Sequence, residues 1–365
     1  MGKSKIRRMF AGGNTSEGFV SYFNYILDLK EAKQYYILKG GPGTGKSTFM
    51  NYIGSEAAKR GYDVEYFHCS SDSDSLDGVS IPGLKVAIVD GTAPHVIDPV
   101  YPGVVEKIIN LGEFWDTGAL AEHKDKFLLW KKEIKFNFAR AYRYLKAAAI
   151  LYEDIKEINM KYIDNIKVKK LTYGLIKELF SDSDEIRNTQ EKEGLERMMF
   201  ASAITPEGAV HHLDSVLNTK KIYGLIGDKG MGINTVLEKI KEEAINRGYR
   251  VECFYCALLP DELEHLIIPG LDISLTTINK YHKTELNVQK HFYFDEFVDK
   301  TASKAYADVL NENKEQIDRL IKRAVDSIVN AKKFHFEMEK YYAPAMDFVR
   351  LTAVKEEVKS SIFAL

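Results

Sequence analysis

The sequence of 365 residues contains one pattern twice, in the same order. Residues 61–69, Gly-Tyr-Asp-Val-Glu-Tyr-Phe-His-Cys, return 187 positions later as residues 248–256, Gly-Tyr-Arg-Val-Glu-Cys-Phe-Tyr-Cys. The tetrapeptide Ile-Pro-Gly-Leu at 81–84 returns at 268–271 with the same spacing. Such ordered self-similarity indicates a tandem duplication.

Two further blocks extend the duplication. Phe10 matches Phe200 at a spacing of 190 residues, and the block beginning at Glu113 matches the block beginning at Glu296 at a spacing of 183. We therefore predict one domain over residues 1–184 and a second over residues 190–365, both of ordinary domain size. The boundary is expected in the polar stretch from Ser181 to Glu193.

Composition places the chain among globular proteins. Apolar residues make up 45% and aromatic residues 12%, enough to bury a core, and 53 acidic against 51 basic residues give no overall nucleic-acid signature. The apolar runs are too short to span a membrane, and residues 1–10 lack the apolar segment of a signal peptide. Cys69, Cys253 and Cys256 are too few for a disulfide framework. We expect a cytoplasmic protein without a membrane segment.

The first copy shows the rhythm of strand, helix and strand. Thr15 is expected to cap a helix that continues to Leu27, supported by the matching Thr205-Pro206-Glu207. This rhythm predicts an α/β fold with a parallel sheet covered by helices, a three-layer α/β/α arrangement in each copy. The expected strands are 35–38, 63–69 and 85–89, with a helix at about 46–59.

Each copy then continues into a long helical arm. Apolar residues recur every three or four positions from Phe127 to Ile155 and again from Ile317 to Tyr342. Pro344 is expected to end the second arm. The apolar stripes are interpreted as core packing.

A glycine-rich loop carries the chemistry. Residues 40–47, Gly-Gly-Pro-Gly-Thr-Gly-Lys-Ser, match G-x-x-x-x-G-K-[ST] in full. Glycines let backbone N–H groups reach phosphate oxygens, while the lysine meets the β- and γ-phosphates and the serine hydroxyl reaches Mg²⁺. The predicted nucleotide-binding residues are Gly40, Gly41, Pro42, Gly43, Thr44, Gly45, Lys46, Ser47 and Thr48.

On these residues the first copy resembles a P-loop NTPase domain. The whole chain resembles an uncharacterised bacterial family of tandem P-loop proteins described as ATPases or nucleotide kinases. The resemblance implies ATP and Mg²⁺ as ligands, and it leaves the reaction open.

The strand that ends at Asp90 resembles the second P-loop motif. Val86-Ala87-Ile88-Val89-Asp90 is an apolar run ending in an acid, and this acid would hold the Mg²⁺ shell together with Ser47. Gly91 follows Asp90 where motor ATPases carry a glutamate base, which favours kinase-like or GTPase-like chemistry. Lys46 and Asp90 are predicted to be catalytic.

The Ser/Asp-rich segment from Cys69 to Gly78 follows the second predicted strand. Because ligands bind at the carboxyl ends of strands in open α/β sheets, Asp72 is a third candidate catalytic residue. The alternative is a solvated polar loop. The second copy replaces Ser70, Ser71 and Asp72 by Ala257, Leu258 and Leu259.

The second copy has lost the phosphate-binding residues. Its loop keeps glycines at 227, 230 and 232, but Ile233 stands where the first copy has Lys46, and Asn234 replaces Ser47. Thr277 matches Asp90. We expect one competent and one degenerate loop.

Other matched residues are His95 with His282 and Arg7 with Arg197, interpreted as structural pairs. Residues 121–146 contain eight basic and three acidic side chains. This excess fits a solvated helix face or a contact with nucleic acid or an acidic partner.

The sequence predicts an ATP-binding protein that hydrolyses ATP with Mg²⁺ at its first loop. The alternatives are a kinase acting on a nucleotide or another small-molecule acceptor, and a non-catalytic nucleotide-gated adaptor. The second copy is expected to serve as a platform that covers the first site or pairs chains into a homodimer.

Overall fold

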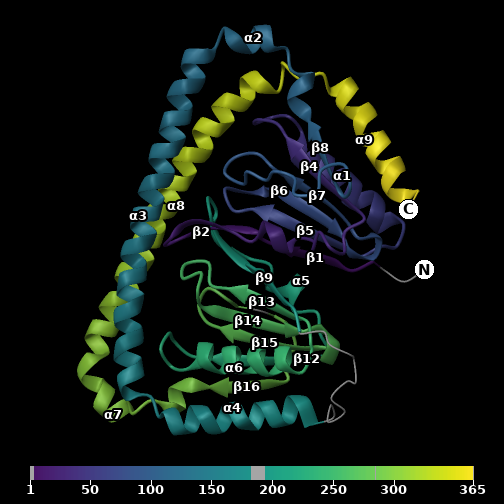
Figure 1. The fold of residues 1–365 in the computed structure, drawn as a ribbon. Coiled ribbons are helices and arrows are strands. Elements are labelled where there is room, and N and C mark those ends of the chain that lie inside the picture. The colour runs from purple at the N-terminus through teal and green to yellow at the C-terminus, as the bar shows by residue number, and fades with distance from the viewer. Residues whose placement is uncertain (1–3, 182–193, 284, 365) are drawn as a thin grey trace.

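The computed structural model describes residues 4–181, 194–283 and 285–364 (Figure 1). Residues 182–193, most of the predicted boundary, lie outside this range. The first repeat contains, in chain order, β1 (Ile6–Met9), β2 (Gly12–Thr15), β3 (Gly18–Ser21), β4 (Gln34–Lys39), α1 (Lys46–Lys59), β5 (Val64–Cys69), β6 (Asp72–Ile81), β7 (Val86–Asp90), β8 (Glu106–Asn110), α2 (Thr117–Ala121), α3 (Lys124–Tyr162) and α4 (Asn165–Phe180).

The second repeat follows the same order with few changes. Its elements are β9 (Glu196–Met199), β10 (Ser202–Thr205), β11 (Gly208–His211), α5 (Leu213–Val216), β12 (Lys221–Ile226), α6 (Ile233–Asn246), β13 (Val251–Tyr255), β14 (Leu263–Ile268), β15 (Ile273–Ile278), β16 (Lys290–Tyr293), α7 (Lys300–Ser303), α8 (Ala307–Tyr342) and α9 (Phe348–Phe363). None of the helices in the described ranges combines the length and apolar character that a membrane crossing needs.

Each repeat forms a six-stranded mixed sheet, so the expectation of a parallel sheet was wrong. The strand order is β1-β5-β6-β7-β4-β8 in the first repeat, and the second repeat has the matching order. β6 runs antiparallel to both β5 and β7, while β4 is parallel to β7 and β8. The segment interpreted as a polar loop is the start of β6. It returns directly as a hairpin because Leu76, Val79 and Ile81 bury an apolar face beside β5 and β7.

The helix expected from Thr15 to Leu27 is also absent. β2 and β3 form a hairpin there, followed by a short 3₁₀ turn at Phe23–Tyr25. The Thr15 hydroxyl accepts a hydrogen bond from the Glu17 backbone N–H and donates one to the Gly18 carbonyl, and Gly18 has φ 98°. The capping residue therefore closes a tight turn rather than a helix. In contrast, the helix predicted at 46–59 is confirmed as α1.

Among the described residues, the long helices cover one face of each sheet, while the other face meets the opposite repeat and the four-residue helix α5, which differs from the expected three layers. Tyr36 and Leu38 of β4 pack with α1 and α9, whereas Tyr35 and Ile37 point to the opposite face. That second face joins a cluster shared by both repeats, which includes residues of the 3₁₀ turn and of α5. Alternate residues along one strand thus serve two different cores.

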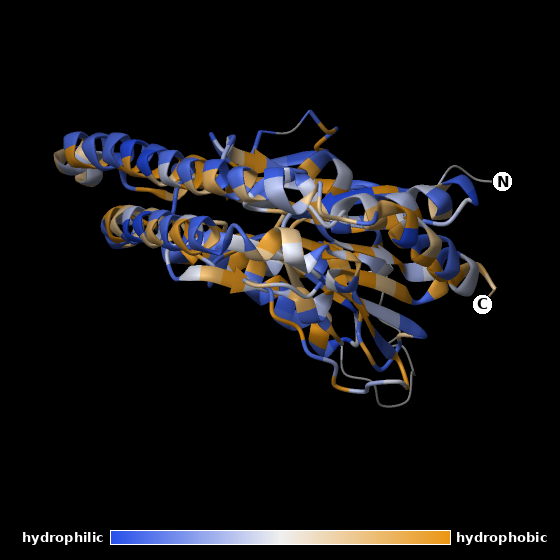
Figure 2. Ribbon diagram, turned by 90° about the horizontal axis from the view of Figure 1, so that it is seen from above, coloured by the Kyte–Doolittle hydropathy of each residue, from blue (hydrophilic) through white to orange (hydrophobic). Residues whose placement is uncertain are grey.

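The two arms lie side by side as an antiparallel pair (Figures 1 and 2). α3, with 39 residues, is about 58 Å long at 1.5 Å per residue. The predicted stripes meet between α3 and α8, where Ala141, Leu145 and Ala148 pack with Ala324 and Ile328. The packing role of the stripes is confirmed, and α8 ends at Tyr342, two residues before Pro344.

The terminal helices of the arms are exchanged between the repeats. α4 packs Val168, Leu175 and Leu179 into the core of the second repeat. α9 packs Val358 and Ile362, together with Leu351, into the core of the first. Each sheet is therefore covered by a helix from the other half of the chain.

A buried ring of four charges joins the repeats at their centre. Arg7 Nη1 donates to Glu65 Oε1 at 2.9 Å, and Arg7 Nη2 donates to Glu252 Oε2 at 2.5 Å. Arg197 Nη2 donates to Glu65 Oε2 at 2.7 Å. Each arginine bridges a glutamate of its own repeat and one of the other, so the matched arginine pair is structural.

Candidate functional site

The first glycine loop connects β4 to α1 at one end of the first sheet. Gly43 and Gly45 have φ 68° and 80°, a left-handed conformation that glycine adopts without steric cost. Lys46 is the first residue of α1, so the free backbone N–H groups of the helix start face the loop. This shape is suited to an anion.

The loop lysine lies against the loop itself and beside an acid. Lys46 Nζ donates to the carbonyl oxygens of Gly40 at 2.7 Å and Gly41 at 2.9 Å. It also lies 3.5 Å from Asp90 Oδ2. The structure thus brings together two of the three predicted catalytic residues, and Lys46 would have to leave two carbonyls to meet an incoming phosphate.

Asp90 lies at the end of β7, the neighbour of β4. Its Oδ1 accepts a hydrogen bond from the Thr92 backbone N–H at 2.8 Å, and the Thr92 hydroxyl donates to the Gly40 carbonyl at 2.8 Å. Burial raises the pKa of Asp90, and Lys46 opposes that shift. A nearby cation would stabilise the ionised form of this carboxylate.

Ser47 contacts the sheet through its hydroxyl. Ser47 Oγ accepts a hydrogen bond from the Leu76 backbone N–H at 3.0 Å, which ties the start of α1 to β6. This hydrogen bond uses one lone pair of Ser47 Oγ, so the second lone pair and the hydroxyl proton remain available. The side chain therefore has a structural contact and keeps capacity for a ligand.

Asp72 lies at the first position of β6 and pairs with the second repeat. Lys332 Nζ of α8 lies 2.7 Å from Asp72 Oδ1 and 3.0 Å from Glu207 Oε1. Ser75 Oγ donates to Asp72 Oδ2 at 2.5 Å. The Asp72 carboxylate is thus already paired with a lysine. This lysine lies far away in the sequence, so the pair could not be predicted from residue spacing.

The arm of the second repeat covers the first loop. A Cβ at Gly43 would meet Ala343 at 3.2 Å, and a Cβ at Gly45 would meet Leu351 at 3.1 Å. Glu339, one turn before Ala343, has a raised pKa because it is partly buried and lies near Asp72; the Gly43 backbone N–H and Lys46 oppose the shift. The Glu339 carboxylate therefore faces the same loop groups that would bind a phosphate.

Sequence analysis missed this α8 face. Lys332, His335 and Glu339 are spaced by three and four residues, so they share one side of the helix. His335 Nδ1 lies 3.6 Å from Glu339 Oε1. The His335 side chain is half exposed, and partial desolvation, followed by repulsion from Lys46, lowers its pKa. In the sequence, polar residues interrupt the apolar stripe of the second arm here, which is a sign of a functional face. The sequence does not show which loop this face covers.

The second loop has the same backbone and different side-chain contacts. Asn234 Oδ1 accepts a hydrogen bond from the Leu263 backbone N–H at 2.9 Å, the counterpart of the bond between Ser47 and Leu76. Ile233 is buried in the core of the second repeat. The degenerate residues therefore keep the helix attached to the sheet without offering a cation.

Charges at the second loop are paired internally. Lys229 Nζ lies 2.9 Å from Glu262 Oε2 and 3.1 Å from Glu264 Oε1, and Lys156 Nζ of α3 lies 3.2 Å from Glu262 Oε1. Asp228 Oδ2 lies 2.5 Å from Lys314 Nζ of α8. A cavity of about 570 Å³ lies beside this network, lined by loop residues 226–235 and by both arms.

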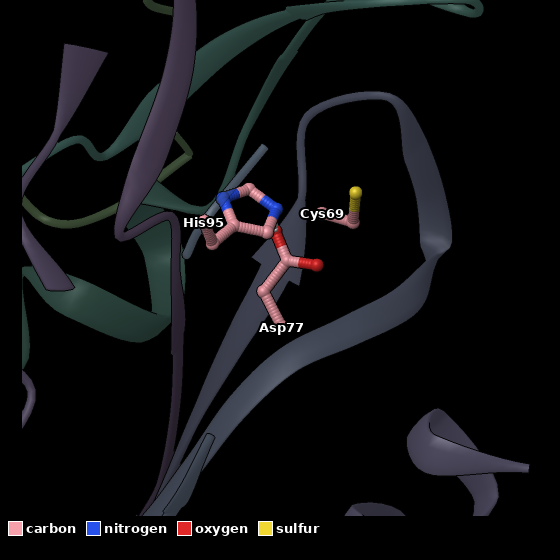
Figure 3. A group of neighbouring side chains, drawn as sticks. All are labelled: Cys69, Asp77 and His95. Atoms are coloured by element: carbon pink, nitrogen blue, oxygen red, sulfur yellow. Dashed lines mark ion pairs between the residues drawn. The ribbon is translucent and has the colours of Figure 1, made fainter. Parts of the chain in front are cut away.

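Each repeat also contains a buried acid–histidine pair. His95 Nε2 lies 3.3 Å from Asp77 Oδ2 in the first repeat, and His282 Nε2 lies 3.5 Å from Glu264 Oε2 in the second. Figure 3 shows His95 and Asp77 facing each other, with Cys69 nearby. Burial opposes protonation of His95, but Asp77 outweighs it and raises the His95 pKa. At His282 burial dominates and lowers the pKa.

No family model, curated protein or solved structure matches this chain.

Proposed function

We propose that the first glycine loop binds ATP and that the chain hydrolyses it. The observation that carries this proposal is the meeting of Lys46, from the start of α1, with Asp90, from the end of the adjacent strand β7, at 3.5 Å. A left-handed glycine loop, a helix start, a lysine and a strand-end acid are the parts that phosphate binding and Mg²⁺ binding require. The proposal extends to the fold: each of the two α/β units is a P-loop NTPase unit.

The residues fit a magnesium-bound nucleotide. Ser47 keeps a lone pair, and the buried Asp90 carboxylate has Lys46 as its only cationic contact within 4 Å among the described residues, so these two side chains would hold Mg²⁺. When bound, Mg²⁺ would neutralise charge on the β- and γ-phosphates. The Lys46 ammonium would move from the Gly40 and Gly41 carbonyls to the phosphates.

Glu339 supplies the base that the sequence around Asp90 lacks. Its carboxylate is directed at the loop from α8, and partial burial raises its pKa, which makes it a stronger base than an exposed carboxylate. It would take a proton from the attacking water as the terminal phosphate leaves ADP, giving ADP and inorganic phosphate.

The experiment compares free phosphate released from ATP with Mg²⁺ by the natural chain and by Lys46→Ala. We expect Lys46→Ala to lose at least tenfold in affinity or turnover, about 1.4 kcal/mol or more. Calorimetric titration should show one strong ATP site per chain. The matched control is Lys314→Ala, which removes the α8 lysine that pairs with Asp228 of the second loop and should leave turnover unchanged. Unchanged binding and turnover in Lys46→Ala would contradict the proposal.

A kinase is the second candidate, because Gly91 and not an acid follows Asp90 on the chain. Product analysis separates the two reactions. A phosphorylated acceptor in place of free phosphate supports the kinase, and binding without either product supports a nucleotide-gated adaptor.

A further inference from the structure

A second cluster of chemically capable side chains lies in the repeat that lost its phosphate-binding residues. β13 and β14 shift register at Phe254 and Tyr255, so Glu264 is an extra residue on β14 next to His265. A bulge of this kind re-aims side chains. Glu264, His265 and His282 each present one potential ligand atom, and these atoms lie within 4.8 Å of one another.

The three side chains are buried and incompletely satisfied. Glu264 Oε1 accepts from Lys229 at 3.1 Å, whereas Glu264 Oε2 has no hydrogen-bond partner in the described ranges. His265 Nδ1 lies 2.7 Å from the Thr276 hydroxyl, which leaves Nε2 without a partner among the residues described. His282 Nε2 lies 3.1 Å from Ser202 Oγ. Buried polar atoms are normally paired, so these free atoms point to a missing ligand.

We propose that Glu264, His265 and His282 bind a divalent transition-metal ion of the zinc class. One carboxylate with two imidazoles is a ligand set that zinc accepts, with distances near 2 Å that modest side-chain movement would reach. Thr276 fixes the ring of His265, and Lys229 fixes the carboxylate of Glu264, as outer partners do in metal sites.

The first repeat lacks this ligand set. Gly78 stands where the second repeat has His265, so the corresponding cluster has one imidazole (Figure 3). This cluster consists of Asp77, His95 and Cys69. The third member, Cys69, has a thiol pKa raised well above its usual value by burial, so the thiolate that would bind metal is disfavoured. The metal site is thus specific to the second repeat.

The site would have an open position. Glu264 and His282 also line the cavity of about 570 Å³, beside Thr277 and Lys229. Three protein ligands with a cavity on one side leave room for a bound water or a ligand oxygen. The inference does not depend on ATP binding, because none of its residues belongs to the first loop.

The test is a titration of the full, tag-free chain with Zn²⁺ after chelator treatment, without nucleotide or Mg²⁺. We expect one Zn²⁺ per chain with a micromolar or lower dissociation constant, and Co²⁺ in its place should give the intense visible absorption of a low-coordinate site. Glu264→Gln and His265→Ala should each raise the dissociation constant at least tenfold. The matched control is His291→Ala, which removes an exposed imidazole of the second repeat and should change nothing.

Circular dichroism establishes that each variant is folded. Zn²⁺ uptake and the Co²⁺ spectrum are measured on the natural chain. They therefore test the metal site even if one variant fails to fold. Absence of stoichiometric uptake, an octahedral aquo-like Co²⁺ spectrum, or binding that survives in both folded variants would each overturn the inference.

Discussion

The two glycine loops of this chain share a backbone and differ in charge. Gly43 and Gly230 have φ 68° and 81°, and the residues before α1 and α6, Gly45 and Gly232, have φ 80° and 95°. The hydrogen bond from β6 to Ser47 reappears as the bond from β14 to Asn234. The shape of the loop is therefore maintained by its contacts with the following helix and the sheet, and it does not require a lysine at the first position of that helix.

The arms that cover the loops also differ in charge. At the spacing of 183 that relates Asp116 to Asp299, Glu339 of α8 corresponds to Lys156 of α3. The first loop, which has Lys46, faces an acid, whereas the second, which has Ile233, faces a lysine that pairs with Glu262. The charge of each loop therefore differs together with the charge of the arm that covers it, although loop and arm come from different halves of the sequence.

The strongest way to break this comparison is to separate the halves. A fragment of residues 1–184 loses the cover of α9, including the buried Leu351, Val358 and Ile362, and it exposes the second face of its sheet. Three such side chains contribute about 5–9 kcal/mol of burial, comparable to the whole stability of a domain. We expect the fragment to aggregate or unfold and to lose activity. A soluble, monomeric fragment as active as the full chain, by light scattering and phosphate release, would show that the repeats are independent.

The next test removes the charge from each arm in turn. Glu339→Gln should lower kcat for phosphate release by roughly 10²–10⁴-fold with a small change in KM, as expected for loss of a general base. The matched variant Lys156→Gln, over the second loop, should leave kcat unchanged. Equal effects of both substitutions would mean that the arms act only through stability.

The smallest effect concerns the two matched histidines. Asp77 raises the pKa of His95, so its contribution to stability is present below about pH 6.5 and is lost as pH rises through the folded-state pKa. Burial lowers the pKa of His282, so its contribution is present above about pH 6.5 and is lost as pH falls.

We therefore expect His95→Gln to destabilise the chain more at pH 5.5 than at pH 8.5. His282→Gln should show the opposite trend. The measurement is the urea midpoint of each variant and of the natural chain at both pH values, without added metal. Parallel trends would contradict the assignment of different protonation states to the matched residues.

The sequence predicted local structure correctly where the conformation of a segment depends on residues close to it in the chain. α1 begins at Lys46 and ends at Lys59 as predicted, because a glycine frame precedes it and Gly61 follows it. The three- and four-residue spacing predicted both arms, and the repeat predicted two copies of one α/β unit, which form two sheets of matching strand order. Thr15 was misread because a threonine followed by an acid favours a helix cap and a tight hairpin turn alike.

What the sequence determined by itself is the duplication, the two glycine frames and the loss of lysine and acid in the second. These properties depend on residue type and short spacing. Only the tertiary structure decided that α4 and α9 are exchanged, that Glu339 faces Gly43, and that Glu264 and His265 point into one cluster. The physical reason is that an apolar stripe specifies a partner surface but not which copy supplies it, and a bulge shifts side chains in a way that spacing along a strand cannot reveal.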